Sequence, residues 1–299
     1  MGISRRSALK AMASVTATSA VSAISARPAA AAEAPADAVG MLYDTTLCIG
    51  CKACVVACAD ANDRERDTAW SEGKWQAPVD LNQHTRNIIK LYVDGPTRSF
   101  VKQQCMHCID PACVNACMLG SLQKREFGIV TYEASLCTGC RYCQMACPYN
   151  IPKFEWTKAF NPKISKCELC NHRLAEGKEP ACCEVCPREA VIYGTRADLL
   201  AEAHRRLEAH PDRYVPKVYG EFDAGGTQVL YLSHVPFEQI GLPDIGPRSV
   251  PETQRSLQHG IYQWFAAPVA LYGVLAAVML RHRAKQGNET AGNADGGQP

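Results

Sequence analysis

The pattern of apolar and polar residues predicts short secondary-structure elements rather than a large apolar core. Residues 198–210 carry apolar side chains at helical spacing behind an acidic residue, which predicts one amphipathic helix. Its apolar face consists of Leu199, Leu200, Ala203 and Leu207. Shorter segments predict strands, and these are residues 87–93, 128–132, 190–193 and 227–232.

Two longer segments lack such a pattern. Residues 59–104 separate the first two cysteine motifs, and we expect their polar part, residues 62–76, to be an inserted surface segment. Residues 211–251 are rich in glycine and proline. Apart from the strand predicted at 227–232, we expect them to form an extended strap.

A long uncharged segment lies near the C-terminus. Residues 260–280 contain no charged side chain, and a helix of this length spans about 30 Å, which is enough to cross a bilayer. Tyr262 and Trp264 lie at its start, where aromatic belts occur. The basic residues Arg281, Arg283 and Lys285 follow directly and favour a cytoplasmic end. The alternative is a buried helix of the core.

The N-terminus has the features of an export signal. Arg5 and Arg6 form a twin-arginine motif, an apolar stretch follows at 11–26, and an alanine-rich cleavage region ends at Ala32. The alternative is an alanine-rich tail with a chance arginine pair. The two ends together predict a protein on the periplasmic side of the inner membrane, anchored by a C-terminal transmembrane helix. The chain before this helix would lie outside the cytoplasm, and the C-terminus would lie inside it.

Five regions are therefore expected. They are a signal peptide at 1–32, a cysteine-rich domain at 33–210, the strap at 211–256, a transmembrane helix at 257–281 and a disordered cytoplasmic tail at 282–299.

Cysteine content changes this picture most. The chain has 17 cysteines, and 16 of them form four sets of four. The sets are Cys48, Cys51, Cys54 and Cys58; Cys105, Cys108, Cys113 and Cys117; Cys137, Cys140, Cys143 and Cys147; and Cys167, Cys170, Cys182 and Cys186. The C-x2-C-x2-C-x3-C spacing of the first and third sets is typical of [4Fe–4S] clusters, whose irons take thiolate ligands. We therefore predict these sixteen residues as metal ligands of four [4Fe–4S] clusters.

Other uses of cysteine explain the spacing less well. Three cysteines within seven residues are poor disulfide partners, and an odd total leaves one unpaired. Structural zinc sites use paired C-x2-C motifs but do not need a third cysteine in the same turn. Of the adjacent pair Cys182 and Cys183, we assign Cys182 as a ligand because it gives a C-x3-C-P ending, and Cys183 as a small buried apolar residue.

The remaining polar residues indicate no catalysis. The net charge is +2, which indicates no nucleic-acid partner. Lysines 153, 158, 163 and 166 form a basic run, for which a solvated face is favoured over a partner surface or the tuning of a cluster potential. His107 could donate a hydrogen bond to a cluster or lie at the surface, and a quinone-binding role for His234 or His259 is disfavoured. We find no catalytic residues and expect no small-molecule substrate of the chain's own.

Several motifs resemble those of one family. They are residues 40–44, the K-Q-Q-C-M-H-C segment at 102–108, C-T-G-C-R-Y-C at 137–143, K-C-E-L-C-N at 166–171 and G-G-T-Q-V-L at 225–230. With the split fourth set, they resemble the ferredoxin-like electron-transfer subunits of membrane-bound respiratory oxidoreductases. This family includes the iron–sulfur subunits of formate dehydrogenase and dimethyl sulfoxide reductase and, most similar to this chain, the HybA-type subunit of periplasmic [NiFe] hydrogenase 2.

The resemblance implies an α+β fold of two tandem, interlocked bacterial-ferredoxin-like modules, followed by the single transmembrane helix. Spacing alone does not settle which sets pair, because 19 residues separate both the second from the third and the third from the fourth. The resemblance implies four ligand groups, which we call groups A to D. They are A, Cys48, Cys51, Cys54 and Cys186; B, Cys58, Cys167, Cys170 and Cys182; C, Cys105, Cys108, Cys113 and Cys147; and D, Cys117, Cys137, Cys140 and Cys143.

The resemblance also implies partners and a role. The chain would relay electrons between the small and large subunits of a hydrogenase and an integral-membrane, quinone-reactive subunit. Three alternatives remain: an iron–sulfur subunit of formate dehydrogenase or another molybdoenzyme, a membrane-tethered zinc or disulfide protein, and a self-sufficient reductase.

Overall fold

The computed structural model describes residues 33–66, 78–252 and 268–283. The chain divides into two compact units. One of them, Ala30–Glu252, contains every cysteine. Of the other unit the structure describes residues 268–283, which are helical and exposed. The expected signal at 1–32 lies outside the described residues, as do 257–267 of the expected span and 284–299 of the expected tail.

The transmembrane helix was expected at 257–281. Within the described residues, no helix is both long and apolar enough to cross a membrane.

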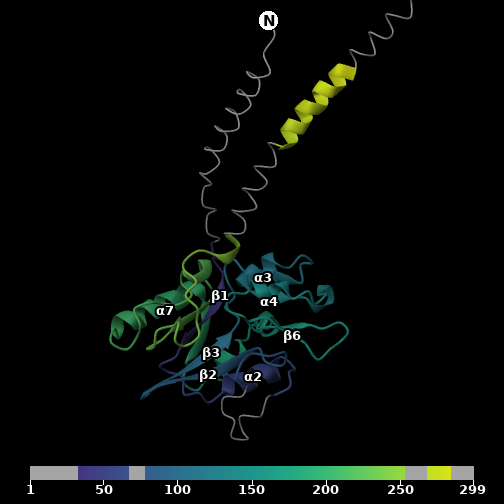
Figure 1. The fold of residues 1–299 in the computed structure, drawn as a ribbon. Coiled ribbons are helices and arrows are strands. Elements are labelled where there is room, and N and C mark those ends of the chain that lie inside the picture. Colours follow the sequence, from purple (N-terminus) through teal and green to yellow (C-terminus); the bar gives the residue numbers. More distant parts are fainter. Residues whose placement is uncertain (1–32, 67–77, 253–267, 284–299) are drawn as a thin grey trace, which may run out of the picture. The chain divides into compact units, whose positions relative to one another are not determined.

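The cysteine-containing unit combines short helices with short strands (Figure 1). The strands are β1 (Val39–Asp44), β2 (Asn87–Asp94), β3 (Thr97–Gln104), β4 (Leu122–Lys124), β5 (Val130–Tyr132), β6 (Lys153–Phe154), β7 (Ile164–Ser165), β8 (Val191–Thr195) and β9 (Val229–Leu232). The α-helices are α2 (Ala53–Ala61), α3 (Ala112–Asn115), α4 (Tyr142–Ala146), α5 (Asn171–Ala175), α6 (Ala181–Glu184) and α7 (Arg196–Ala209). The mixed helix-and-strand composition expected from the sequence is confirmed.

A three-stranded sheet with the order β8-β1-β9 joins the two ends of this unit. β1 is antiparallel to β8 and parallel to β9, so that Met41 faces Tyr193 on one side and Val229 on the other. Alternate side chains of β1 point to opposite faces. Leu42 therefore packs with Leu230 and Leu232 under α7, whereas Met41 and Tyr43 belong to the larger core that contains the cysteines.

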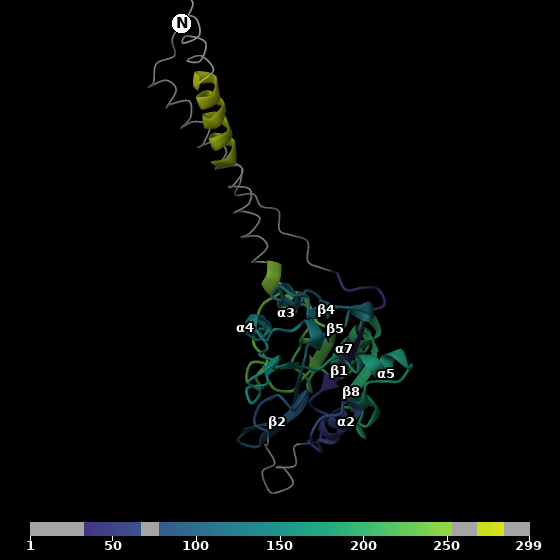
Figure 2. The same cartoon turned by 90° about the vertical axis from the view of Figure 1, so that its right-hand side faces the viewer.

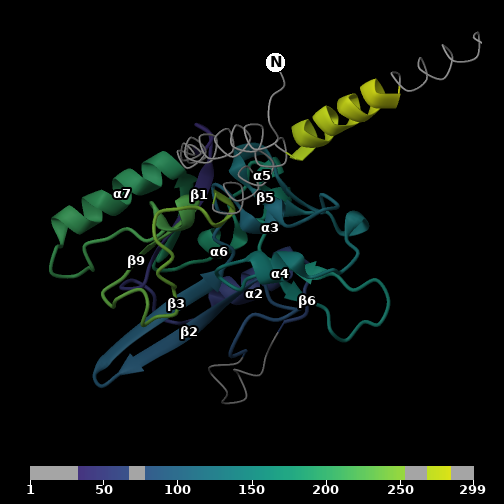
Figure 3. The ribbon, with the colours of Figure 1, turned by 45° about the horizontal axis from the view of Figure 1, so that its top comes forward.

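Helix α7 covers one face of this sheet (Figure 3). Leu199 and Ala203 are buried, as the apolar spacing predicted, and the helix begins two residues earlier than expected. Thr195 caps it, because the Thr195 hydroxyl accepts a hydrogen bond from the Asp198 backbone N–H at 3.2 Å. The predicted helix is confirmed.

The other strands form two-stranded sheets that pair β2 with β3, β4 with β5, and β6 with β7. β2, β5, β8 and β9 confirm the four predicted strands within two residues at each end. The strands β1, β3, β4, β6 and β7 were not predicted. The β4–β5 pair lies beside α3, and the β2–β3 hairpin lies nearer α2 (Figure 2).

The segment expected as a strap does not leave the cysteine-containing unit. Residues 211–252 belong to the same compact unit, with β9 in its central sheet and Val235, Phe237 and Ile240 in its core. The buried carboxylate of Asp44 accepts a hydrogen bond from the Tyr214 hydroxyl at 2.8 Å and lies 3.3 Å from Arg206 Nη1. Asp44 therefore ties β1 to α7 and to the segment that follows it.

Candidate metal centre

All 17 cysteines are free thiols in the structure. Helix contacts pair the four sequence sets, which spacing alone did not. Helix α2, which carries Cys54 and Cys58, packs on α6, which carries Cys182. Helix α3, which carries Cys113, packs on α4, which carries Cys143. The first set thus lies against the fourth and the second against the third, as in the modules implied by the resemblance; α3 and α4 lie side by side in Figure 1.

Two of the four expected ligand groups each line one cavity. All four cysteines of group A, Cys48, Cys51, Cys54 and Cys186, line a cavity together with Tyr43 and Ile89. All four of group D, Cys117, Cys137, Cys140 and Cys143, line a cavity of about 240 Å³ whose wall also includes Leu122, Tyr132 and Ile164. Cys51 and Cys140 are the exposed members of these groups, so both cavities lie close to the surface.

The thiols of group B act on one another electrostatically. Burial raises the pKa of the Cys58 thiol, and charge on Cys167, Cys182 and Cys170 raises it further. Burial also raises the pKa of Cys167 to about 12. These four thiols therefore lie near one another inside the unit.

Group C behaves in the same way. Burial, followed by charge on Cys105, Cys147 and Cys113, raises the pKa of Cys108 well above its usual range. Burial raises the pKa of Cys147 to about 11 and that of Cys113 to about 12. The structure thus brings the cysteines of groups A and D around one cavity each and those of groups B and C near one another. The assignment of all sixteen as cluster ligands stays a prediction.

The backbone turns back toward the first cysteine of each set. The second residue after that cysteine has a positive φ in all four sets: 70° at Gly50, 47° at His107, 72° at Gly139 and 54° at Leu169. In three of them the backbone N–H of this residue donates a hydrogen bond of 3.4 Å to the cysteine Sγ. These turns aim amide dipoles at sulfur, which is the kind of contact that tunes iron–sulfur potentials.

The donors present fit a [4Fe–4S] cluster. Each group offers four soft thiols, three of the turns supply N–H···S contacts, and His107 offers an additional buried group. His107 Nδ1 accepts the Val130 N–H at 3.1 Å, so the proton of the neutral ring sits on Nε2, which has no partner among the described residues. A cluster sulfide would satisfy this donor. His107 is fully buried, so the alternative of a surface histidine is wrong.

A cubane places each thiolate on a different iron and needs a wider ring of sulfurs than a single ion does. Within the described residues, no group of three or more His, Cys, Asp or Glu side chains has the spacing to hold a single metal ion.

The adjacent cysteines Cys182 and Cys183 differ in their surroundings. A hydrogen bond from the Cys183 thiol lowers the pKa of Cys182, and the charge of Lys102 lowers it further. The same hydrogen bond raises the pKa of Cys183. The two thiols therefore differ in the direction of their pKa shifts, although both are buried. The assignment of Cys182 as ligand and Cys183 as the spare residue stays a prediction.

The basic run divides between surface and interior. Lys158 is exposed, Lys153 pairs with Asp80 at 3.1 Å, and Lys163 donates to the Ala134 carbonyl at 2.6 Å. Lys166, by contrast, is buried, so the expectation of a solvated face is wrong at this residue. A second buried lysine, Lys102 on β3, begins the motif at 102–108 but was given no role of its own. It shares a strand face with Gln104 and lies three residues before Cys105. His234 is exposed, and His259 lies outside the described residues.

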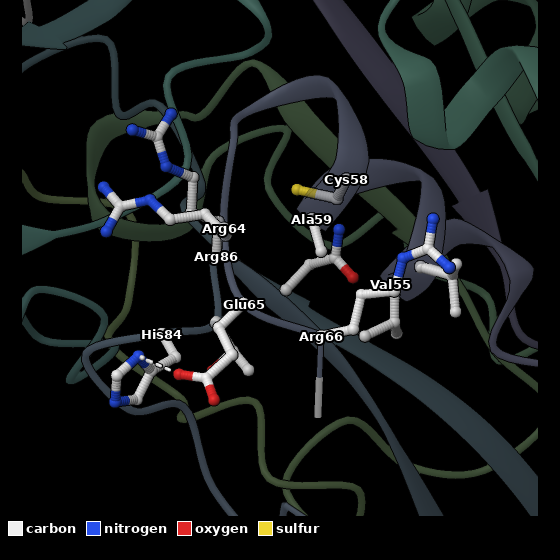
Figure 4. Close-up of a pocket in the computed structure, with 11 residues that line it drawn as sticks. Val55, Cys58, Ala59, Arg64, Glu65, Arg66, His84 and Arg86 are labelled. Atoms are coloured by element: carbon white, nitrogen blue, oxygen red, sulfur yellow. Dashed lines mark ion pairs between the residues drawn. The ribbon is translucent and has the colours of Figure 1, made fainter. Parts of the chain in front are cut away.

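Three arginines line a small pocket beside Cys58, with their side chains shown in Figure 4. Arg66 pairs with Asp60, Arg86 pairs with Glu168 at 2.9 Å, and Arg64 donates to the Gln83 carbonyl. Two of the three guanidinium groups beside Cys58 are therefore paired with carboxylates, and the third is held by a backbone carbonyl.

Comparison with known proteins agrees with this geometry. The family described as "4Fe-4S dicluster domain" matches residues 97–196. The chain is 39% identical over 290 residues to the Hydrogenase-2 operon protein HybA of Escherichia coli O157:H7, an alignment that covers 85% of this chain and 88% of the relative. It is 36% identical over 203 residues to the nitrate-inducible formate dehydrogenase iron-sulfur subunit of Escherichia coli (strain K12), covering 66% of this chain and 68% of that one. Identity to the formate dehydrogenase iron-sulfur subunit of Haemophilus influenzae is 34% over 207 residues, covering 66% and 64%.

Proposed function

Because the chain belongs to the family of HybA-type iron–sulfur subunits, we propose that it is the electron-transfer subunit of a periplasmic [NiFe] hydrogenase. In this role it relays electrons through four [4Fe–4S] clusters to or from a quinone-reactive membrane subunit. The observation that carries the proposal is that the sixteen motif cysteines are free thiols within one compact unit, where two sets of four each line one cavity.

The chain's own residues explain how such a relay would be built. The thiolates of groups A to D would hold one cluster each, and a bound [4Fe–4S] cluster would take up and release one electron. Interlocking of the sets through α2–α6 and α3–α4 would keep the two clusters of each module close together. Burial of Cys58, Cys105 and Cys167 would exclude water from the interior of the path, and the exposed Cys51 and Cys140 would lie at its surface.

Export and anchoring complete the proposal. Arg5 and Arg6 support export of the folded, cluster-loaded chain by the twin-arginine route. The uncharged segment 260–280 and the basic residues after it support a C-terminal anchor with a cytoplasmic tail. Alkaline carbonate washing of membranes tests this anchor: the full-length chain should stay in the pellet, and release of the full-length chain would contradict the anchor but not the relay.

A second function has its own support. The formate dehydrogenase iron-sulfur subunits align over about two thirds of the chain, and they too are iron-sulfur subunits by name. In that case the relay would be unchanged, but its electrons would come from a molybdenum or tungsten enzyme.

The experiment that separates the two is a metal analysis of the native complex. Membranes would be solubilised gently, and the chain would be isolated by a tag together with what remains bound to it. Nickel with abundant iron is expected. Molybdenum or tungsten without nickel would overturn the hydrogenase assignment in favour of the molybdoenzyme.

A further inference from the structure

Two lysines lie wholly inside the cysteine-containing unit. Lys102 is 0% exposed and Lys166 is 2% exposed. Neither pairs with a carboxylate within the part of the chain that the structure describes. An ammonium group is costly to bury unless an opposite charge compensates it. Their counter-charge must therefore come from another kind of group.

Cysteine sulfur supplies that charge at Lys102. The ammonium of Lys102 donates to Gln104 Oε1 and lies among the thiols of Cys182, Cys54 and Cys167. The acceptor Gln104 Oε1 is neutral, and the Gln104 amide lies 3.1 Å from Met41 Sδ, which is itself 4.0 Å from Cys182 Sγ. Sulfur is therefore the group at hand to compensate a buried ammonium at Lys102. Cys54 belongs to group A and the other two cysteines to group B. Lys102 thus lies between the two groups of one module.

Lys166 occupies a comparable place near the other module. Its Nζ donates to the Val130 carbonyl at 2.5 Å and to the Cys167 carbonyl at 2.8 Å. These two acceptors are neutral and leave its charge uncompensated. Burial raises the pKa of both Cys113 and Cys147, and the charge of Lys166 lowers both. Both cysteines belong to group C.

We propose that Lys102 and Lys166 are fixed buried counter-charges that raise the reduction potentials of different clusters, Lys102 at groups A and B and Lys166 at group C. The inference rests on the proposed function, because it assumes that the groups hold clusters. A cluster gains one negative charge when it is reduced, so a nearby positive charge stabilises the reduced form. The effect is strong where water is excluded, as it is around both lysines.

The test is an EPR-monitored redox titration of the intact, cluster-loaded complex. Signals would first be assigned to groups with single-cysteine variants. Lys102→Met should move the potentials of groups A and B to more negative values and leave group C unchanged. Lys166→Met should move the potential of group C to a more negative value and leave that of group A unchanged. Lys158→Met, at an exposed lysine of the same basic run, should shift nothing.

Iron content keeps the outcomes distinct. If Lys102→Met loses iron, Lys102→Gln replaces it, because glutamine keeps a hydrogen-bonding group beside Gln104 and lacks only the charge. The inference would be overturned if a lysine variant kept its full iron content and its clusters kept their potentials, at groups A and B for Lys102 or at group C for Lys166. The proposed relay would then still stand. A wild-type chain without four clusters would instead overturn the proposed function itself.

Discussion

At the scale of single residues, the left-handed turn after the first cysteine of each set is the most demanding feature. The positive φ costs an ordinary residue about 1–2 kcal/mol, and glycine avoids this cost. Two of the four sets use glycine, Gly50 and Gly139, whereas His107 and Leu169 adopt the same conformation without it. Cluster binding provides a reason to retain this strain, since the turn aims an N–H at sulfur.

Gly50→Ala tests the turn. Gly50 has a φ of 70°, and an added Cβ would collide with the ring of Phe100. The matched control is Gly95→Ala, where φ is 53° and nothing lies within 4 Å of the new atom. The control should lose about 1–2 kcal/mol of unfolding free energy and keep its iron. Gly50→Ala should lose more and should also lose the iron of group A, measured by thermal unfolding and iron analysis. Equal behaviour of the two variants would contradict the role given to this turn.

The adjacent cysteines provide a second test at this scale. Both Cys182 and Cys183 are buried, so replacing either one by alanine removes a similar volume. Cys182→Ala should reduce the iron content by about four atoms per chain, the content of one [4Fe–4S] cluster. Cys183→Ala should keep the full iron content. The opposite result, with iron lost only in Cys183→Ala, would show that Cys183 is the ligand and Cys182 the spare residue.

Residue chemistry was partly predictable from the sequence. The sixteen cysteines stand out because their spacing is demanded by the cluster. The burial of Lys102 and Lys166 was not predictable, because lysine is almost never fully buried unless it is paired, and the pairing sulfurs come from distant parts of the chain.

At the scale of elements, segments with a regular apolar pattern were predicted, and segments without one were missed, whatever their length. Helix α7 and the strands β2, β5, β8 and β9 were predicted, since each has a clear apolar or β-branched pattern. β1 was missed even though it lies at the centre of the main sheet. It is six residues long and has buried residues on both faces, so it lacks the alternation that marks a half-buried strand.

The α7 cap gives the element-scale prediction. Thr195→Ala removes the side-chain acceptor for the Asp198 N–H and should cost about 0.5–2 kcal/mol of unfolding free energy. Because α7 packs on the sheet and carries no cysteine, the iron content should not change. Thermal unfolding with parallel iron analysis measures both. An unchanged melting temperature relative to Thr97→Ala, at an exposed threonine, would show that the cap does not stabilise α7.

At the scale of the whole molecule, cysteines separated by more than 100 residues are brought together. Cys48 and Cys186 line one cavity because β1 pairs with β8 and α2 packs on α6. The sequence spacing left this pairing open, and only the family resemblance implied it. Residues 211–252 return to the same unit because β9 completes the sheet beside β1, a long-range contact that no local pattern in the strap reveals.

The central claim is that this unit holds four [4Fe–4S] clusters. The most direct test is to count iron, acid-labile sulfide and zinc in the chain purified without oxygen from its native membranes and separated from its partners. The account predicts about sixteen iron atoms and about sixteen sulfides per chain, four of each per cluster. Zinc in place of iron, iron without sulfide, or about eight iron atoms per chain in a fully loaded preparation would contradict it.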